Sequence, residues 1–393
     1  MSQNNKVILP GSTIGILGGG QLGRMIVEAG SALGYKFMTL DPTENGPMGQ
    51  VSKQVTAKYD DVEAALTLAQ QSDVITYEFE NVDASVAKTL MEKSYVPQGS
   101  ELLYTTQHRL REKRAIEAAG VDVAPYREIT SYDSLVQAVA ELGLPAVFKT
   151  ATGGYDGKGQ FVIREHTELQ VAYDTLVKHK TELVLEKFIS FEKEISVIAA
   201  RSVSGEIKVF PPAENIHVNN ILHLSIVPAR IDASLASQAE QLALKIATGL
   251  DVVGLIAVEM FVTQDGKLYV NELAPRPHNS GHYTMEACYT SQFEQHVRAV
   301  CNLPLGSTRL RQPVVMVNVL GQHMTGLLDY MQKEDTLAEQ LEVNIKVHLY
   351  GKADAVHNRK MGHVNVLAHD VETALKWIEE TAIWQEEWQS WQD

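Results

Sequence analysis

Two glutamates that face each other across a predicted β-hairpin constrain this chain more than any other feature of its sequence. Residues 258–279 read VEMFVTQDGKLYVNELAPRPHN, two apolar strands joined by Asp265–Gly266. An Asp-Gly pair between apolar runs is typical of a two-residue hairpin turn. Folding about that turn predicts three cross-strand pairs: Gln264 with Lys267, Phe261 with Val270, and Glu259 with Glu272.

The pairing of Glu259 with Glu272 brings like charges together, which destabilises a sheet unless a cation lies between them. Carboxylate oxygens suit Mg²⁺, which takes one or two of them and fills its other positions with phosphates and water. The alternative is a pair of solvated glutamates on an exposed face. The hairpin alone does not decide between a metal site and that alternative.

The length and composition limit what the rest of the chain can be. At 393 residues it exceeds one ordinary hydrophobic core, so about two or three domains are expected. The net charge of -15 argues against nucleic acid or an anionic membrane as the main partner. The chain shows no signal-peptide pattern and no apolar run long enough to span a membrane, and Cys288 and Cys301 lack metal-type spacing. We therefore expect a globular, cytoplasmic protein with reduced thiols.

The first part of the chain carries a dinucleotide-binding fingerprint. Gly18–Gly23 fits G-x-G-x-x-G between an expected strand, Thr13–Leu17, and an expected helix, Arg24–Leu33. A second expected strand, Lys36–Leu40, ends at Asp41, the acidic residue of that fingerprint. These features predict a parallel α/β domain. They leave open whether the glycines bind NAD or only allow close backbone packing.

A glycine-rich loop at 153–160 lies between two further expected strands, Ala146–Lys149 and Phe161–Arg164. Its backbone N–H groups can wrap an anion, as a glycine-rich loop covers nucleotide phosphates, although a plain hairpin turn with surplus glycines has the same pattern. Lys149, at the end of an apolar strand, either meets an anion or reaches solvent along its own stem. Together the lysine, the loop and the two glutamates are typical of a triphosphate clamp with Mg²⁺.

Six segments resemble the ATP-grasp superfamily and, within it, the 5-(carboxyamino)imidazole ribonucleotide synthases of de novo purine biosynthesis. In the order of that family they are GILGGGQLGRM at 15–25, YEFENV at 77–82, FKTATGGYDGKGQ at 148–160, PPAENIH at 211–217, NELAPRPHNSGH at 271–282, and YGK with HNRKMGH between 350 and 363. NELAPRPHNSGH together with GYDGKGQ is specific to this branch, whereas GGGQLGRM also occurs in a formate-dependent relative. No motif position departs from the family pattern.

The resemblance implies an ATP-dependent carbon–nitrogen ligase. In that family, ATP, bicarbonate and 5-aminoimidazole ribonucleotide give the N-carboxylated nucleotide, ADP and phosphate through carboxyphosphate. Such a mixed anhydride needs a closed, dry site, and the glycine-rich loop is the obvious lid. The implied cofactors are ATP and Mg²⁺, with Mn²⁺ as a substitute.

The resemblance also implies roles for individual residues. The implied ATP contacts are Arg109, Lys149, Gly154, Tyr155, Asp156, Gly157, Lys158, Gly159, Gln160, Glu186, Lys187, Phe188, Ile189, Glu194, His217, Asn271 and Glu272. Residues 186–189 match an adenine-binding segment on the expected strand Leu183–Ile189, and Glu194 matches the carboxylate that binds the ribose hydroxyls. Glu259 and Glu272 match the metal ligands, in agreement with the hairpin. Asn271 points away from them in a regular register, so its role requires a twist or bulge.

The remaining implied roles concern bicarbonate and the acceptor nucleotide. Arg276 lies in a proline-flanked turn, where its guanidinium suits bicarbonate or carboxyphosphate oxygens. His278 and Asn279 complete the catalytic set with Arg276 and Lys149. The implied acceptor contacts are Tyr155, Asp156, Arg276, Lys352, Arg359 and Gln21. The alternative for Lys352 and Arg359 is a solvated basic loop.

Two other functions remain open. A formate-dependent glycinamide ribonucleotide transformylase shares the ATP clamp, but HNSGH and HNRKMGH argue against it. An NAD-dependent dehydrogenase explains Gly18–Gly23 with Asp41, but it leaves Lys149 and the opposed glutamates unexplained. A structural or interaction protein explains none of these costly polar features.

The predicted fold is α/β, an ATP-grasp fold with flanking domains. A Rossmann-like (pre-ATP-grasp) domain is expected over residues 1–105, a two-lobed ATP-grasp domain over 106–305 with its lid at 153–160, and a small β-rich C-terminal domain over 306–393. A Trp-bearing helix over Glu372–Trp391 is expected to close the chain. The expected partners are small molecules, with neither nucleic acid nor membrane, and the resemblance implies a homodimer.

Overall fold

The N-terminal part of the chain is the parallel α/β domain that the glycine fingerprint predicts. The computed structural model describes residues 6–153, 159–179, 181–381 and 383–388. In this domain the strands follow the order β3-β2-β1-β4, and all neighbours are parallel. The elements are β1 (Thr13–Leu17), α1 (Gln21–Ala32), β2 (Lys36–Asp41), β3 (Lys53–Thr56), α2 (Val62–Gln70), β4 (Val74–Tyr77) and α3 (Ala84–Lys93). Helix α1 begins at Gln21 rather than at the predicted Arg24, so the last glycine of the fingerprint lies in its first turn.

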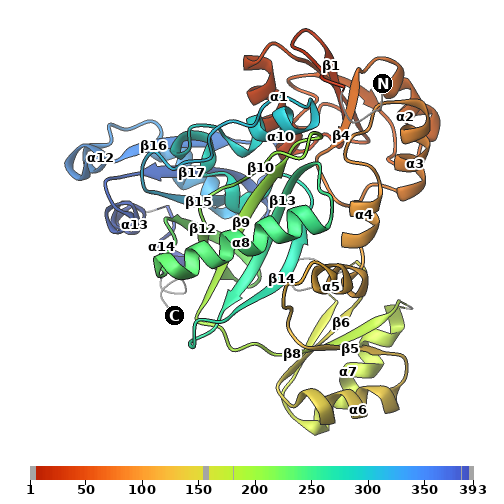
Figure 1. Ribbon diagram of the computed structural model, residues 1–393. Helices are drawn as coiled ribbons and strands as arrows, with labels where there is room; N and C mark the ends of the chain where they lie inside the picture. The colour runs from red at the N-terminus through yellow and green to blue at the C-terminus, as the bar shows by residue number, and fades with distance from the viewer. Residues whose placement is uncertain (1–5, 154–158, 180, 382, 389–393) are drawn as a thin grey trace.

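A small antiparallel lobe carries the glycine-rich loop and lies apart from the N-terminal domain (Figure 1). Its strands follow the order β5-β8-β6-β7, and their apolar side chains pack against α6 and α7. Helices α4 (Glu101–Thr106) and α5 (Arg109–Ala118) connect the domain to the lobe. The elements of the lobe are β5 (Tyr126–Ile129), α6 (Tyr132–Leu142), β6 (Ala146–Thr150), β7 (Gln160–Ile163), α7 (Leu169–Leu176) and β8 (Leu183–Lys187). Strand β8 thus ends before the predicted Ile189.

A large antiparallel sheet forms the centre of the molecule, in the order β14-β13-β9-β11-β12-β15-β17-β16 with β10 beside β9. The C-terminal strands β15 to β17 extend this sheet and do not form one of their own. Helix α8 crosses the sheet in Figure 1, and its buried side chains pack on β9 and β13. The strands of this sheet are β9 (Lys193–Arg201), β10 (Ile207–Val209), β11 (Ala213–Val218), β12 (Ile221–Val227), β13 (Gly254–Val262), β14 (Leu268–Ala274), β15 (Val314–Leu320), β16 (Asn344–Leu349) and β17 (Lys360–Leu367). The helices of this part of the chain are α8 (Ala233–Gly249), α9 (Thr284–Ala287), α10 (Gln292–Val300), α11 (Met324–Tyr330), α12 (Thr336–Leu341), α13 (Val371–Glu380) and α14 (Gln385–Trp388).

The hairpin of β13 and β14 pairs Glu259 with Glu272, as predicted, but its turn differs from the prediction. The turn is closed by Gly266, whose backbone N–H donates to the Thr263 carbonyl at 2.8 Å and whose φ is +75°. A turn followed by a left-handed glycine is typical of a three-residue hairpin loop, not a two-residue one. Accordingly, the predicted pair of Gln264 with Lys267 is wrong, because both residues lie in the loop between the strands.

A bulge restores the register of the hairpin. Phe261 pairs with Tyr269, so the predicted partner Val270 is wrong. Between Glu259 and Met260 the register shifts by one residue, and Asn271 is the extra residue on β14. The longer loop and the bulge cancel, which is why the glutamates still face each other. The bulge also provides the irregularity that a role for Asn271 requires.

The closing helix is shorter than predicted. Helix α13 ends before Thr381, whose extended backbone (φ -77°, ψ 143°) breaks the predicted helix, and α14 follows as a separate turn. The break lets Trp384 enter the core beside Trp377, and its indole N–H donates to the Asn318 carbonyl at 3.1 Å. Residues 389–391 of the predicted helix lie outside the described residues. Among the described helices, none is long and apolar enough to cross a membrane.

Candidate active site

A cavity of about 710 Å³ lies where the N-terminal domain, the lobe and the central sheet meet. Residues from all three parts line it, so a ligand there would touch segments that are far apart in the sequence. The lining contains many of the residues singled out in the sequence: Gln21, Arg109, Lys149, Gln160, Glu186, Lys187, Phe188, Ile189, Glu194, His217, Glu259, Asn271, Glu272, Arg276, His278 and Asn279.

The other predicted site residues are not part of the described lining. Gly154–Lys158 lie outside the described residues, and Gly159 is described but does not line the cavity. Lys352 donates to the carbonyl of Lys360, a lining residue, at 2.7 Å, while Arg359 donates to the Asp354 carbonyl. Neither cation lines the described cavity, although Lys352 contacts a residue that does. Burial, with Arg359 and Lys360 nearby, lowers the pKa of Lys352 to about 8.

The opposed carboxylates differ in what surrounds them. Glu259 accepts from His278 Nε2 at 3.0 Å, whereas Glu272 meets Arg109 Nη1 at 3.9 Å. Burial would raise the pKa of Glu259, but the hydrogen bond from His278, together with the nearby charge of Arg276, outweighs it and holds that pKa at about 2. Burial and the Glu259 charge raise the pKa of Glu272, whose side chain is 51% exposed to the cavity. Two facing carboxylates with so little cationic compensation fit a divalent cation.

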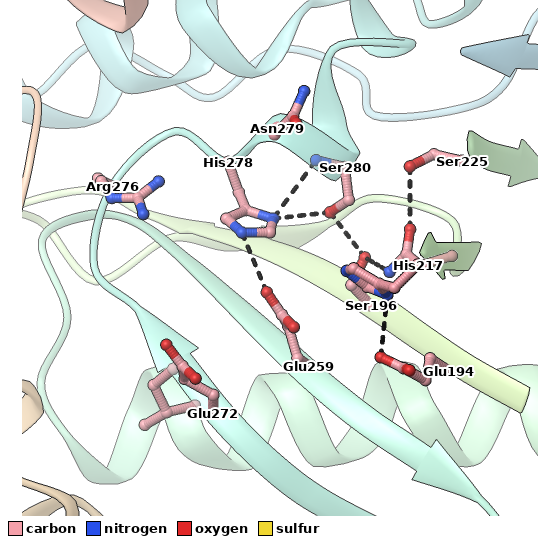
Figure 2. A network of polar contacts seen from close by, with 12 residues as sticks. Glu194, Ser196, His217, Ser225, Glu259, Glu272, Arg276, His278, Asn279 and Ser280 are labelled. Atoms are coloured by element: carbon pink, nitrogen blue, oxygen red, sulfur yellow. Dashed lines mark hydrogen bonds and ion pairs between the residues drawn. The ribbon is translucent and has the colours of Figure 1, made fainter. Parts of the chain in front are cut away.

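His278 connects this pair to a buried polar network (Figure 2). Its Nδ1 lies 2.9 Å from the Ser280 hydroxyl, and that hydroxyl accepts from Ser196 at 2.7 Å. Ser196 in turn accepts from the side-chain amide of Asn215, which accepts from Ser225. No local pattern in the sequence indicates this network, because its members lie on β9, β11, β12 and the turn Asn279–Gly281.

Arg276 points into the same region from the segment after β14 (Figure 2). Its guanidinium binds both carboxylate oxygens of Glu80, which lines the cavity from the N-terminal domain. Burial would raise the pKa of Glu80, but the Arg276 charge outweighs it and lowers that pKa. Neighbouring Asn279 exchanges hydrogen bonds of 3.0 and 2.8 Å with Asn318 of β15. Sequence reasoning identified Arg276 and Asn279 but not their partners.

Lys149 meets a protein carboxylate rather than solvent. Its ammonium lies 3.1 Å from Glu186 Oε2, and Lys113 of α5 approaches the same oxygen at 3.3 Å. Burial would raise the pKa of Glu186, but Lys149 and Lys113 outweigh it and hold that pKa at about 2. The second oxygen, Oε1, is buried without a hydrogen-bond partner among the described residues. Lys113 was missed because it lies in a strongly charged helical segment that gives no sign of burial.

Another part of the cavity wall combines an apolar contact with a polar one. Phe191 and Phe261 stack with their ring centroids 4.6 Å apart, and both line the cavity. Nearby, His217 Nδ1 lies 3.0 Å from Glu194 Oε2. Burial would lower the pKa of His217, but Glu194 outweighs it and raises that pKa. A flat apolar surface beside a carboxylate suits a base and a pair of hydroxyl groups.

The glycine fingerprint is filled by the protein itself. The backbone N–H groups of Gly20 and Gly23 donate to the two oxygens of Glu78, and Gly19 donates to Asp41 at 2.8 Å. Burial raises the pKa of Glu78 to about 7 in spite of these donors. A pyrophosphate would need the same N–H groups. The geometry therefore contradicts the dehydrogenase interpretation of this motif.

Comparisons with known proteins agree with this geometry. Three protein-family models match the chain: the ribonucleotide synthetase preATP-grasp domain over residues 11–107, the ATP-grasp domain over 114–293, and the phosphoribosylaminoimidazole carboxylase C-terminal domain over 314–376. The N5-carboxyaminoimidazole ribonucleotide synthase of Bacillus subtilis (strain 168) is 51% identical over 378 residues, with 96% of each chain covered.

Solved structures agree as well. An ADP complex of an N5-carboxyaminoimidazole ribonucleotide synthetase matches with a TM-score of 0.92 and 54% identity, covering 98% of this chain and 100% of that one. The N5-carboxyaminoimidazole synthase of Aspergillus clavatus, in complex with ADP and 5-aminoimidazole ribonucleotide, matches with a TM-score of 0.86 and 31% identity, covering 94% and 96% of the two chains.

Proposed function

The chain belongs to the ATP-grasp family of N5-carboxyaminoimidazole ribonucleotide synthases, and we propose that its central cavity is where ATP, bicarbonate and 5-aminoimidazole ribonucleotide react. The protein is an ATP-dependent carbon–nitrogen ligase of purine biosynthesis that carboxylates the amino group of this ribonucleotide. The observation that carries the site assignment is the convergence of Glu259, Glu272, Lys149 and Arg276 on one cavity.

ATP would occupy the side of the cavity between the lobe and the hairpin. The phenyl rings of Phe191 and Phe261 offer a flat apolar wall, and Glu194 offers acceptors for ribose hydroxyls. Lys149 and Arg109 supply cations for the phosphates, since both line the same space. Glu259 and Glu272 would hold Mg²⁺, which neutralises phosphate charge when bound. Their facing side chains and the weak cationic compensation of Glu272 support this assignment.

Arg276 and His278 would bind the bicarbonate. A bicarbonate oxygen attacks the γ-phosphorus, the bond to ADP breaks, and carboxyphosphate forms. The exocyclic amine of the acceptor then bonds to the carboxyl carbon, phosphate leaves with the bridging oxygen, and the nitrogen loses a proton. Arg276 is suited to orient the carboxyl oxygens through both steps, because its guanidinium can bind two oxygens at once. Its present partner Glu80 shows that it can bind a carboxylate in this way.

The acceptor nucleotide would lie between the N-terminal domain and the end of the central sheet. Gln21, Tyr350 and Lys360 line this part of the cavity. Lys352 and Arg359 are the proposed partners of the nucleotide phosphate, since a dianion would compensate the burial and the repulsion from neighbouring cations that lower the pKa of Lys352. Tyr155 and Asp156 of the lid remain predicted acceptor contacts, outside the described residues.

Oxygen tracing tests this reaction most sharply. With ¹⁸O-labelled bicarbonate, Mg²⁺-ATP and 5-aminoimidazole ribonucleotide, the released phosphate should carry one bicarbonate oxygen, as detected by mass spectrometry. Phosphate without label during active carboxylation would contradict attack by bicarbonate on the γ-phosphorus. Product formed from formate instead would favour the transformylase alternative.

We also propose that the enzyme acts in the cytoplasm as a homodimer. The thiols of Cys288 and Cys301 are free and buried, which suits a reducing compartment. Light scattering on the purified protein tests the assembly: a mass twice that of the 43.4 kDa chain is expected, and a monomer at working concentration would contradict it.

A further inference from the structure

We propose that a buried chain of polar side chains positions His278 as an Nε2–H donor facing the reaction centre, and that its members are Ser280, Ser196, Asn215 and Ser225 (Figure 2). The inference rests on the proposed function, because it takes His278 to be a group that touches bicarbonate. The four residues are positioning residues, since each acts on the substrate only through His278.

The hydrogen-bonded side chains lead from the cavity across three neighbouring strands of the central sheet. Ser280 lies in the turn after β14, Ser196 on β9, Asn215 on β11 and Ser225 on β12. Successive contacts measure 2.9 Å from His278 Nδ1 to Ser280, 2.7 Å to Ser196, 2.9 Å to Asn215 and 2.9 Å to Ser225. A continuous path of short hydrogen bonds thus connects the interior of the sheet to the imidazole.

The four side chains are buried, so each of them needs a hydrogen-bond partner. The exposed fractions are 1% for Ser280, 2% for Ser196, 5% for Asn215 and 0% for Ser225. Polar groups in such a place cost free energy unless each finds a partner, and a satisfied network fixes one arrangement. Apolar residues could fill such positions, as Ile198 does two residues farther along the same face of β9. The chain is therefore better explained by what it holds at its end.

The direction of the hydrogen bonds can be assigned from the end at His278. Nε2 faces the carboxylate of Glu259, which only accepts, so Nε2 carries the proton. Nδ1 faces the backbone N–H of Ser280 at 3.4 Å, which only donates, so Nδ1 is the acceptor. The Ser280 hydroxyl therefore donates to Nδ1. This leaves it free to accept from Ser196, which accepts from the Asn215 amide.

The consequence is a fixed tautomer. With Nδ1 occupied by two donors, the proton of a neutral His278 stays on Nε2, the nitrogen that faces Glu259 and the cavity. Loss of these polar side chains would free Nδ1 to take the proton and turn Nε2 into an acceptor, which cannot donate a hydrogen bond to bicarbonate. Partners behind a functional histidine typically act in this way on its tautomer and orientation.

The test combines imidazole ¹⁵N NMR with steady-state kinetics on the full-length protein. We expect the wild type to show His278 as the Nε2–H tautomer, with the signal assigned by its loss in His278→Gln. In Ser280→Ala the tautomers should mix, and kcat should fall by about 10- to 100-fold, the usual range for such partners. Ser196→Ala should lower kcat by about tenfold and Ser225→Ala by about threefold, because the break lies progressively farther from the imidazole. The KM for ATP should change by less than about twofold, because none of the four positioning residues lines the cavity.

Matched variants separate positioning from simple stability. Ser196→Thr keeps the hydroxyl and should restore the wild-type tautomer and most of kcat. Ser202→Ala is the control, because Ser202 is also buried and hydrogen-bonded just after β9 but has no contact with the chain. If Ser280→Ala does not fold, Ser225→Ala at the far end gives the same readouts. An unchanged tautomer and kcat in Ser196→Ala and Ser225→Ala would overturn the inference. A wild type with no bicarbonate-dependent turnover would instead overturn the proposed function.

Discussion

At the start of α1 the backbone N–H groups that could bind an anion are already used, whereas at the β13–β14 hairpin the carboxylate of Glu272 is still open to a cation. Gly20 and Gly23 donate to Glu78, a residue from the neighbouring strand end. Among the described residues, the one ion pair of Glu272 is with Arg109 at 3.9 Å, and its side chain is half exposed. Both regions carry a ligand-binding pattern, but only the hairpin leaves unsatisfied charge facing a space that a ligand can enter.

This difference shows how a motif should be evaluated in a structure. A glycine-rich turn at a helix N-terminus binds phosphate only if its donors point at free space. Here the same donors fix Glu78, which lines the cavity. The turn therefore serves to position a protein carboxylate.

The largest effect on activity is expected from removing the charge of Glu272 at the β13–β14 hairpin. Glu272→Gln keeps the size of the side chain but removes a proposed metal ligand, so the rate of ADP release should fall by about 10³-fold. A coupled assay for ADP measures this. Asp265→Asn at the tip of the same hairpin is the control, since Asp265 does not line the cavity. A Glu272→Gln rate within about threefold of the wild type would place the metal elsewhere.

Removing Glu78, the acceptor at the start of α1, should lower the stability of the protein. Glu78→Ala leaves the N–H groups of Gly20 and Gly23 without their acceptor, and the free energy of unfolding should drop by about 2 kcal/mol. Urea unfolding followed by circular dichroism measures the change. Glu92→Ala, an exposed change on α3, should leave stability unaltered. Unchanged stability in Glu78→Ala, or tight NADH binding by the wild type, would show that these donors are available after all.

Lys113 tests whether a cation that is paired within the protein still affects the binding of ATP. It is 2% exposed and shares Glu186 with Lys149. In Lys113→Met, the buried Glu186 carboxylate loses one of its two close lysines, so Lys149 is held more firmly and is less free to meet a phosphate. The KM for ATP should rise by about 10- to 30-fold, with a smaller change in kcat.

Initial-rate kinetics at varied ATP measure this change. Arg114→Met on the same helix is the control, because its ion pair with Glu128 is exposed and should matter little. An equal fall in kcat at unchanged KM would mean that Lys113 acts on another step.

Lys352 gives the smallest effect, in the form of a pH dependence. Its pKa of about 8 in the folded protein means that its charge is present below that pH and lost above it. If the charge binds the acceptor phosphate, kcat/KM for 5-aminoimidazole ribonucleotide should fall about tenfold from about pH 7 to about pH 9. Lys352→Arg stays charged and should remove this fall. Identical profiles for the wild type and Lys352→Arg would remove Lys352 from the phosphate site.

Local signals made much of the fold predictable. The expected strands Thr13–Leu17 and Val258 onward follow from apolar runs bounded by turn residues, and the structure places them as expected. The register near Phe261 was wrong because an Asp-Gly pair also fits a longer loop, and a bulge leaves no local mark in the sequence. The long closing helix was wrong because burial of Trp384 in the core outweighs helical continuity.

Partners distant in the chain were the hardest part of the site to predict. Arg276 was identified, but Glu80, its partner, is 196 residues away and is brought to it only by the packing of two domains. Lys113 lies in the charged helix α5, and it is buried against Glu186 and Tyr126 of the lobe. The polar chain behind His278 combines four elements. Residue type can indicate which groups carry chemistry, but the folded arrangement decides which groups hold them.

The rate of ADP release with and without bicarbonate tests the central claim most directly. The measurement uses the wild type with Mg²⁺-ATP and 5-aminoimidazole ribonucleotide, first with bicarbonate and then after its rigorous removal, with formate added in a third arm. The account predicts rapid release only when bicarbonate is present, and no rescue by formate. Release that is indifferent to bicarbonate, or that formate restores, would contradict it.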